Sequence, residues 1–151
     1  GVKLHPRSQG FDMVGAEAMK LYAKIEKAGL VVLIHAGFGL DYVADDLYKM
    51  ARTFPKMKII VGHGGFTELD NVIKLLQNRE NVMFDTSTMR IFDLVELINN
   101  VSYKKIVFGS DIPIYDQTLA LQMLVDSATM AKHTPHQIRS MLGENIQKWL
   151  K

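Results

Sequence analysis

The feature that most constrains the fold is a regular alternation of short apolar runs with longer amphipathic stretches. Each run is followed by a polar or glycine-containing turn and then by residues with helical periodicity, which is typical of βαβ units in a parallel sheet. The runs begin roughly every 20–30 residues, about the length of one strand–helix unit. They span residues 2–5, 30–35, 58–63, 82–85 and 106–109. The sequence therefore predicts an α/β protein with about five parallel strands and flanking helices.

The stretches between the runs carry signals for helix ends. Asp12 and Asp41 are predicted to cap the first two helices. Thr134 followed by Pro135 predicts the start of a final helical region, which Gly143 should interrupt. The other predicted helices cover residues 68–76, 90–100 and 117–131. No linker or second domain is apparent.

Length and composition narrow the class of protein but leave two architectures open. A complete barrel of eight strand–helix units takes about 250 residues, and this chain has 151. Five parallel strands could instead form an open, doubly wound sheet. The apolar fraction of 48% and the net charge of +2 are those of an ordinary soluble protein, so no nucleic-acid or membrane partner is expected. The absence of cysteine fits a cytoplasmic location and restricts any metal site to nitrogen and oxygen ligands.

Polar residues gather where the predicted strands end. Both α/β architectures place their active sites at the carboxyl ends of the strands. His35, His63 and Asp111 lie at or just after three such ends. Imidazole and carboxylate groups converging from separate strands form the arrangement that a metal site needs. We therefore expect these three side chains to approach one another at one end of the sheet.

Residues near the other strand ends have weaker or more general roles. Alternation along the first strand puts Lys3 and His5 on the same face, where they could line the substrate pocket or take part in the site. Arg7 could bind a substrate carboxylate, and an ordinary surface ion pair is the alternative. Asp85 is expected to act as a hydrogen-bonding residue behind the site rather than as a ligand.

Several of these segments together resemble a known enzyme family. The segments 32–37 (VLIHAG), 60–65 (IVGHGG) and 107–113 (VFGSDIP) are similar to motifs of amidohydrolase family 2. Residues 1–6 resemble its fourth strand, residues 81–87 its seventh, and residues 143–145 (GEN) its closing motif. The resemblance implies that residues 1–151 form the C-terminal part of a (β/α)8 TIM-type barrel, supplying strands four to eight, with strands one to three absent.

The resemblance also implies roles for the residues at the strand ends. His35, His63 and Asp111 would hold a divalent metal, zinc by preference with manganese and iron as alternatives, and His63 and Asp111 would be catalytic. Lys3, His5 and Arg7 would bind a small carbonyl-containing substrate. The implied activity is that of a metal-dependent hydrolase using metal-activated water, and related family members are decarboxylases or hydratases.

The chain departs from the family pattern in one important respect. The family's metal site is completed by a His-x-His pair on the first strand, and the sequence contains no such pair. We therefore expect the chain to be a fragment that is inactive or nearly so by itself. A further alternative is a non-catalytic half-barrel. Both the enzyme fragment and the half-barrel would have open strand edges, which predict a homo-oligomer.

Overall fold

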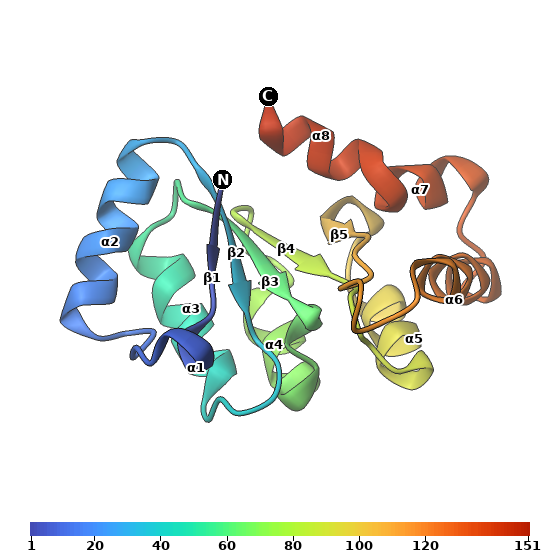
Figure 1. Ribbon diagram of the computed structural model, residues 1–151. Coiled ribbons are helices and arrows are strands. Elements are labelled where there is room, and N and C mark those ends of the chain that lie inside the picture. Colours follow the sequence, from blue (N-terminus) through green and yellow to red (C-terminus); the bar gives the residue numbers. More distant parts are fainter.

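The computed structural model describes all residues from Gly1 to Lys151 and contains one five-stranded parallel sheet (Figure 1). Neighbouring strands follow one another in the chain, in the order β1-β2-β3-β4-β5, and every pairing is parallel. The strands are β1 (Val2–Leu4), β2 (Val31–His35), β3 (Lys58–Gly62), β4 (Val82–Asp85) and β5 (Ile106–Val107). The prediction of five parallel strands is confirmed.

Helices follow the strands and cover the convex side of the curved sheet (Figure 1). The α-helices are α1 (Pro6–Gln9), α2 (Ala16–Lys27), α3 (Val43–Thr53), α4 (Leu69–Leu76), α5 (Ile91–Asn100), α6 (Gln117–Met130), α7 (Pro135–Arg139) and α8 (Asn145–Leu150). Two 3-10 turns, η1 (His63–Glu68) and η2 (Tyr103–Lys105), and a π turn, η3 (Ser140–Glu144), complete the chain. None of the helices is long and apolar enough to cross a membrane.

The strand order decides between the two architectures that the sequence leaves open. Right-handed crossovers that always step in the same direction place their helices on one face of the sheet. A doubly wound sheet reverses direction at its switch point and has helices on both faces. The sequential order from β1 to β5 therefore corresponds to part of a barrel wall.

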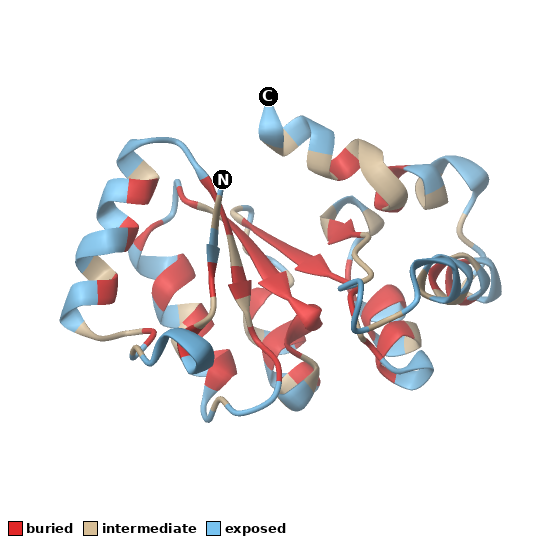
Figure 2. Ribbon diagram, viewed as in Figure 1, coloured by how far each residue is buried: buried red, intermediate tan, exposed pale blue.

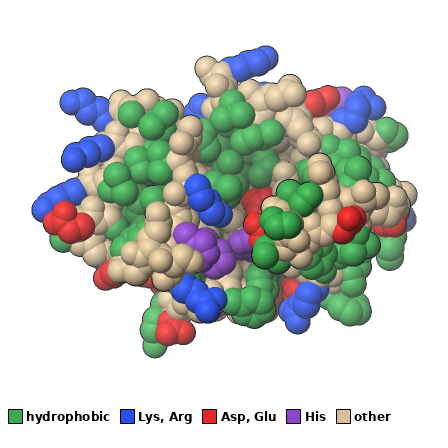
Figure 3. Space-filling model, in the orientation of Figure 1, with side chains coloured by type: hydrophobic (Ala, Val, Ile, Leu, Met, Phe, Trp, Pro, Cys, Tyr) green, Lys and Arg blue, Asp and Glu red, His purple; other side chains and the backbone are tan.

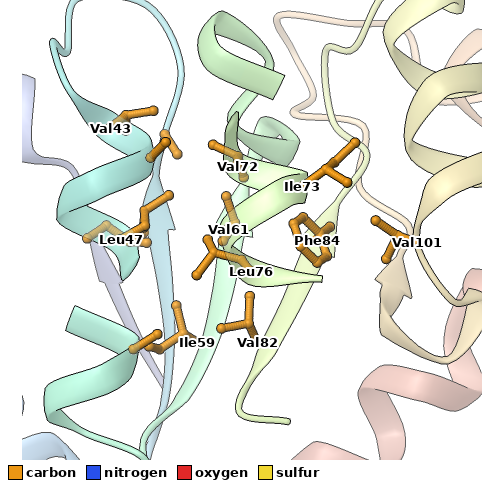
Figure 4. Close-up of a cluster of buried hydrophobic side chains, with 14 of the residues drawn as sticks. Val43, Leu47, Ile59, Val61, Val72, Ile73, Leu76, Val82, Phe84 and Val101 are labelled. Carbon is orange, nitrogen blue, oxygen red and sulfur yellow. The ribbon is translucent and has the colours of Figure 1, made fainter. Parts of the chain in front are cut away.

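The main core lies between the convex face of the sheet and the helices (Figures 2 and 4). Alternate strand residues point into it, because successive side chains of a strand face opposite sides. From the helices, Leu47 and Leu76 pack against them with at most 1% of their surface exposed. The strand residues of this core include Val32, Ile34, Ile59, Val61, Val82, Phe84 and Ile106.

The concave face of the sheet has a smaller apolar cluster of its own. Its four buried members are the strand residues Val31, Ile60, Met83 and Val107. Ile146 and Trp149 of α8 pack against this cluster, so the last helix closes part of the concave side. The ammonium group of Lys58 donates a hydrogen bond to the Trp149 carbonyl, 2.6 Å away, and so fixes the helix to the start of β3.

Strand β5, at one edge of the sheet, is held from behind by the C-terminal region. The buried amide of Asn145 donates to the carbonyl oxygens of Tyr103 at 2.6 Å and Ile106 at 2.9 Å. The Phe108 N–H donates to the Met141 carbonyl at 3.0 Å. These bonds satisfy backbone groups around the short strand that have no partner in the sheet.

Some local predictions are wrong at the helix ends. Asp12 does not cap α2: its carboxylate accepts from the Val14 N–H, and the helix begins after Gly15. Likewise Tyr42, in a left-handed conformation, precedes α3 in place of Asp41. Gly143 lies inside the π turn between α7 and α8 and does not interrupt the helical path. The structure also adds the short helix α1, and β5 ends at Val107.

Candidate active site

Three histidines from successive strand ends form one cluster, at the centre of the face seen in Figure 3. His35 is the last residue of β2, and His63 follows the last residue of β3. The Nε2 atom of His63 lies 3.0 Å from Nδ1 of His35, within hydrogen-bond distance. The ring of His5 stacks on the ring of His35, with centroids 3.8 Å apart and planes 13° from parallel. The predicted approach of His35 and His63 is therefore observed.

A left-handed turn directs the His63 side chain into the protein. His63, Gly64 and Gly65 have φ values of 59°, 59° and 70°. This region is readily adopted by glycine and uncommon for other residues. Side chains would also collide here, since a Cβ on Gly64 would lie 2.9 Å from the Met89 sulfur and one on Gly65 would lie 2.8 Å from Val72. The two glycines let the chain turn sharply, and His63 is left only 6% exposed.

Residues after β4 surround the inner nitrogen of His63. Its Nδ1 atom lies 2.9 Å from the hydroxyl of Ser87 and 2.9 Å from that of Thr88, with the Ser87 carbonyl at 3.3 Å. The His63 backbone N–H donates to the Asp85 carboxylate at 3.0 Å, and the Ser87 hydroxyl donates to the same oxygen. Asp85 thus has the expected hydrogen-bonding position. The sequence analysis missed Ser87 and Thr88, although they lie two and three residues after Asp85, the strand end that it identified.

Burial and neighbouring charge lower the pKa of both His35 and His5. The pKa of His35 is lowered to about 4, chiefly by desolvation and then by the positive charges that His5 and His63 would carry. The pKa of His5 is also lowered, first by desolvation and then by the nearby Lys3 ammonium. At neutral pH the His35 ring therefore has one nitrogen with a free lone pair, able to bind a proton or a metal ion.

A cavity of about 520 Å³ opens beside the histidine pair. Its walls combine a guanidinium, a carboxylate, two imidazoles and aromatic rings. Arg7, from α1, donates a long hydrogen bond of 3.5 Å to the Phe38 carbonyl, and the rings of Phe38 and Phe66 meet edge to face with centroids 4.8 Å apart. The lining residues are Arg7, His35, Gly37, Phe38, His63, Phe66, Thr88, Asp111, Ile114 and Tyr115. The cavity has a size and chemistry suited to a small organic anion.

The predicted substrate-binding residues are divided between two places. Arg7 borders the cavity of the histidine pair, and His5 supports His35 by stacking. Lys3 lines a second cavity, of about 500 Å³, on the concave face of the sheet. That cavity is mainly apolar and is bordered by Asp85 and by residues of α8, including Ile146.

The predicted metal ligands match a divalent metal in donor type but not in number. Asp111 borders the same cavity as His35 and His63, on an exposed turn in which its φ is 63°. No group of three histidine, aspartate or glutamate side chains lies close enough together to hold a metal ion. Structural and catalytic zinc sites normally have at least three protein ligands. The residues of this chain therefore do not make a complete metal site, and the ligand roles of His35, His63 and Asp111 stay predictions.

The family model of the amidohydrolases, Amidohydro_2, matches residues 1–151. The chain belongs to this family. None of the curated proteins compared with this amidohydrolase matches it significantly.

Solved structures share the fold of the amidohydrolase chain over part of their own length. An uncharacterised TIM-barrel protein from Bordetella bronchiseptica matches 93% of this chain with 52% of its own, at 16% identity and a TM-score of 0.74. A dihydroxybenzoic acid decarboxylase from Polaromonas, solved with bound manganese and 2-nitroresorcinol, matches 92% of this chain with 55% of its own, at 14% identity and a TM-score of 0.68. A probable 2-pyrone-4,6-dicarboxylic acid hydrolase from Acinetobacter baumannii, with citric acid bound, matches 99% with 63%, at 15% identity and a TM-score of 0.65.

These likenesses confirm the barrel-type fold of the amidohydrolase. The chain spans little more than half the length of the structures that it matches. Together with the sequential strand order, this makes the chain a partial (β/α) barrel. The family is one of metal-dependent enzymes, and manganese is bound in one of the matched structures.

Proposed function

We propose that the chain provides the proton-transfer and anion-binding part of a metal-dependent hydrolase that acts on a small carbonyl-containing carboxylate. The observation that carries the proposal is the cavity shared by the His35–His63 pair, Asp111 and Arg7. It brings an anion-binding group, a carboxylate and neutral imidazole within reach of one small molecule. Zinc is the proposed metal, with manganese and iron as alternatives.

Each of these side chains has a task that its chemistry supports. The guanidinium of Arg7 can bind a substrate carboxylate through two parallel hydrogen bonds. Asp111, exposed at the cavity wall, can accept a proton from an attacking water. His63 can take part in proton transfer through its hydrogen bond to His35, whose ring faces the reacting group. Phe38 and Phe66 supply an apolar wall against which a flat substrate can pack.

Metal binding by this chain alone should be weak, because the chain does not bring three ligands together. Calorimetric titration with zinc chloride at pH 7.5 tests this. We expect weak binding that is abolished in His35→Ala and kept in His136→Ala, in which an exposed histidine is removed from α7. Tight stoichiometric binding that survives His35→Ala would show that other residues are the ligands.

Decarboxylation is the second candidate reaction, and a matched structure favours it. The Polaromonas structure is that of a decarboxylase of an aromatic acid, and the cavity here is bordered by the aromatic residues Phe38, Phe66 and Tyr115. In both proposed reactions the substrate carries a carboxylate that Arg7 can bind, so the role of Arg7 is common to them.

Binding of 2,6-dihydroxybenzoate, followed by NMR, tests the anion site without requiring turnover. We expect perturbed signals from His35 and His63 in the wild type, and at least tenfold weaker binding in Arg7→Gln. Arg52→Gln, which removes an exposed arginine at the end of α3, is the matched control and should bind as the wild type does. Equal binding by all three proteins would refute the role of Arg7.

A further inference from the structure

A continuous hydrogen-bonded path leads from Asp85 through Ser87 to His63 and on to His35. We propose that Asp85 and Ser87 are positioning residues that fix the tautomer of both histidines, so that each ring carries its proton on Nδ1. The free lone pair of the two histidines then lies on Nε2 of His35. Neither Asp85 nor Ser87 borders the cavity with His35 and His63, so their influence on a molecule bound in that cavity passes through the two rings.

The direction of the hydrogen bonds begins at the carboxylate. An ionised carboxylate can only accept hydrogen bonds. Asp85 accepts one from the backbone N–H of His63 and one from the Ser87 hydroxyl. Ser87 has a single hydroxyl proton, and a hydrogen bond to a charged acceptor is roughly twice as strong as a neutral one. That proton is therefore directed at Asp85, and the Ser87 oxygen presents lone pairs to Nδ1 of His63, 2.9 Å away.

The same direction continues through the two rings. The Ser87 carbonyl, which can only accept, also faces Nδ1 of His63 at 3.3 Å, so two acceptors favour a proton on this nitrogen. A neutral ring protonated at Nδ1 has its lone pair at Nε2. His35 must then donate from its own Nδ1, 3.0 Å away, which leaves Nε2 of His35 unprotonated.

The opposite direction is less favourable at both ends of the path. It would place a proton on Nε2 of His35, where its one acceptor would be the Phe38 carbonyl at 3.4 Å, whereas Nδ1 of His63 has the Ser87 hydroxyl oxygen at 2.9 Å as well as the Ser87 carbonyl. At the other end, Nδ1 of His63 would need a donor. Thr88 is the hydroxyl that remains for it, while the Ser87 carbonyl would face a lone pair.

The tautomers matter because they decide which atom of the cluster can act. With the lone pair on Nε2, His35 can bind a metal ion or accept a proton through the nitrogen that is not engaged with His63. This use of the lone pair rests on the proposed function. The proton arrangement itself does not, since it follows from the hydrogen bonds of the chain as it stands.

Histidine tautomers can be read directly from ¹⁵N NMR. Long-range ¹H–¹⁵N correlation spectra of the ¹⁵N-histidine-labelled chain at pH 7.5 distinguish protonated from unprotonated ring nitrogens, and His35→Gln and His63→Gln assign the signals. We expect both rings to be protonated at Nδ1. Protonation at Nε2 in either ring, or at both nitrogens, would overturn the proposal. The result does not depend on activity or on carboxylate binding, so the proposal and the proposed function can fail separately.

Variants of the path separate positioning from simple packing. Ser87→Ala should move the His63 and His35 tautomers together towards Nε2, and Ser87→Thr, which keeps the hydroxyl, should restore the wild-type pattern. Thr88→Val removes the other hydroxyl near Nδ1 and should leave both tautomers unchanged. The amide spectrum of each variant reports whether it folds. Wild-type tautomers in a folded Ser87→Ala would refute the role of Ser87, and the wild-type measurement stands if that variant does not fold.

Discussion

Replacing Gly109 by alanine should damage the fold at the same carboxylate that organises the histidines. A Cβ at position 109 would meet Oδ1 of Asp85 at 2.0 Å and Cβ of Ser87 at 3.3 Å. The first distance is far inside van der Waals contact, so either the Asp85 side chain or the chain after β5 must move by more than 1 Å, on the order of the overlap. Asp85 and Ser87 are both buried, and any turn of the Asp85 carboxylate away from position 109 breaks its present hydrogen bonds.

The cost follows from the bonds that such a movement breaks. Asp85 accepts hydrogen bonds from the backbone N–H of His63 and from the Ser87 hydroxyl. Each hydrogen bond to a charged group contributes about 1.5–3 kcal/mol. Partial loss of both should lower the free energy of unfolding by about 2–4 kcal/mol. For a domain of this size that corresponds to a drop in melting temperature of roughly 5–15 °C.

Urea unfolding followed by circular dichroism gives the free energy of unfolding for each variant. Gly143→Ala is the matched control, since a Cβ there meets nothing within 4 Å and the residue lies in a helical turn. That variant should be stabilised by about 0.5–1 kcal/mol through reduced freedom of the unfolded chain. If Gly109→Ala lies within about 0.5 kcal/mol of the wild type, the packing of Gly109 on Asp85 is not what holds this part of the site.

Three further changes have expected outcomes. The pKa of His35 is about 4 in the folded chain and 6.5 for an unperturbed histidine, so between these pH values the unfolded chain binds a proton that the folded chain does not. The free energy of unfolding should therefore fall as the pH falls from 6.5 to 4. The loss in free energy of unfolding, discounted for solvent screening, is about 1–2 kcal/mol. Urea unfolding of the wild type and of His35→Gln over this pH range measures it, and the same dependence of stability on pH in both proteins would contradict it. Tyr22→Phe removes a buried hydroxyl without a hydrogen-bond partner, so its melting temperature should be unchanged or higher; a clear decrease would reveal a partner for the hydroxyl. The edge strand Val2–Leu4 should pair with a second chain, whereas the outer edge of Ile106–Val107 is already bonded to the C-terminal region. Sedimentation at micromolar concentration should therefore show a homo-oligomer, most simply a dimer, and a stable monomer would exclude this.

The sequence predicted the strands well because their patterns reflect burial directly. The run at residues 30–35 became β2, which starts at Val31, and the run at residues 82–85 became β4 without change. Both are apolar up to their last residue and are bounded by turn residues. The polar residues at the ends, His35 and Asp85, could be located for the same reason, since the end of a strand fixes the position of the next side chain.

The details of the site depend on contacts that a local pattern does not contain. The left-handed backbone at His63 and Gly64 brings the chain so close to Met89, from a later part of the chain, that a Cβ on Gly64 would lie 2.9 Å from its sulfur. Asp111 lies four residues beyond the end of β5, on an exposed turn. Its position near a strand end in the sequence was not enough to predict whether its carboxylate joins His35 and His63 in a group of three ligands, and in the structure it does not. The choice between a barrel wall and a doubly wound sheet was open for a related reason, because helix patterns are the same in both.

The bracing of β5 by Asn145 has a consequence for how the molecule opens. The strand has two residues, and the amide that holds its Ile106 carbonyl lies 39 positions further along the chain. Trp149 of the same helix covers the concave cluster that includes Val107. Release of α8 therefore removes both a backbone anchor and an apolar cover from β5 at once. The two elements should open and close as one cooperative unit, exchanging their amide hydrogens together and faster than β2 and β3 in the middle of the sheet.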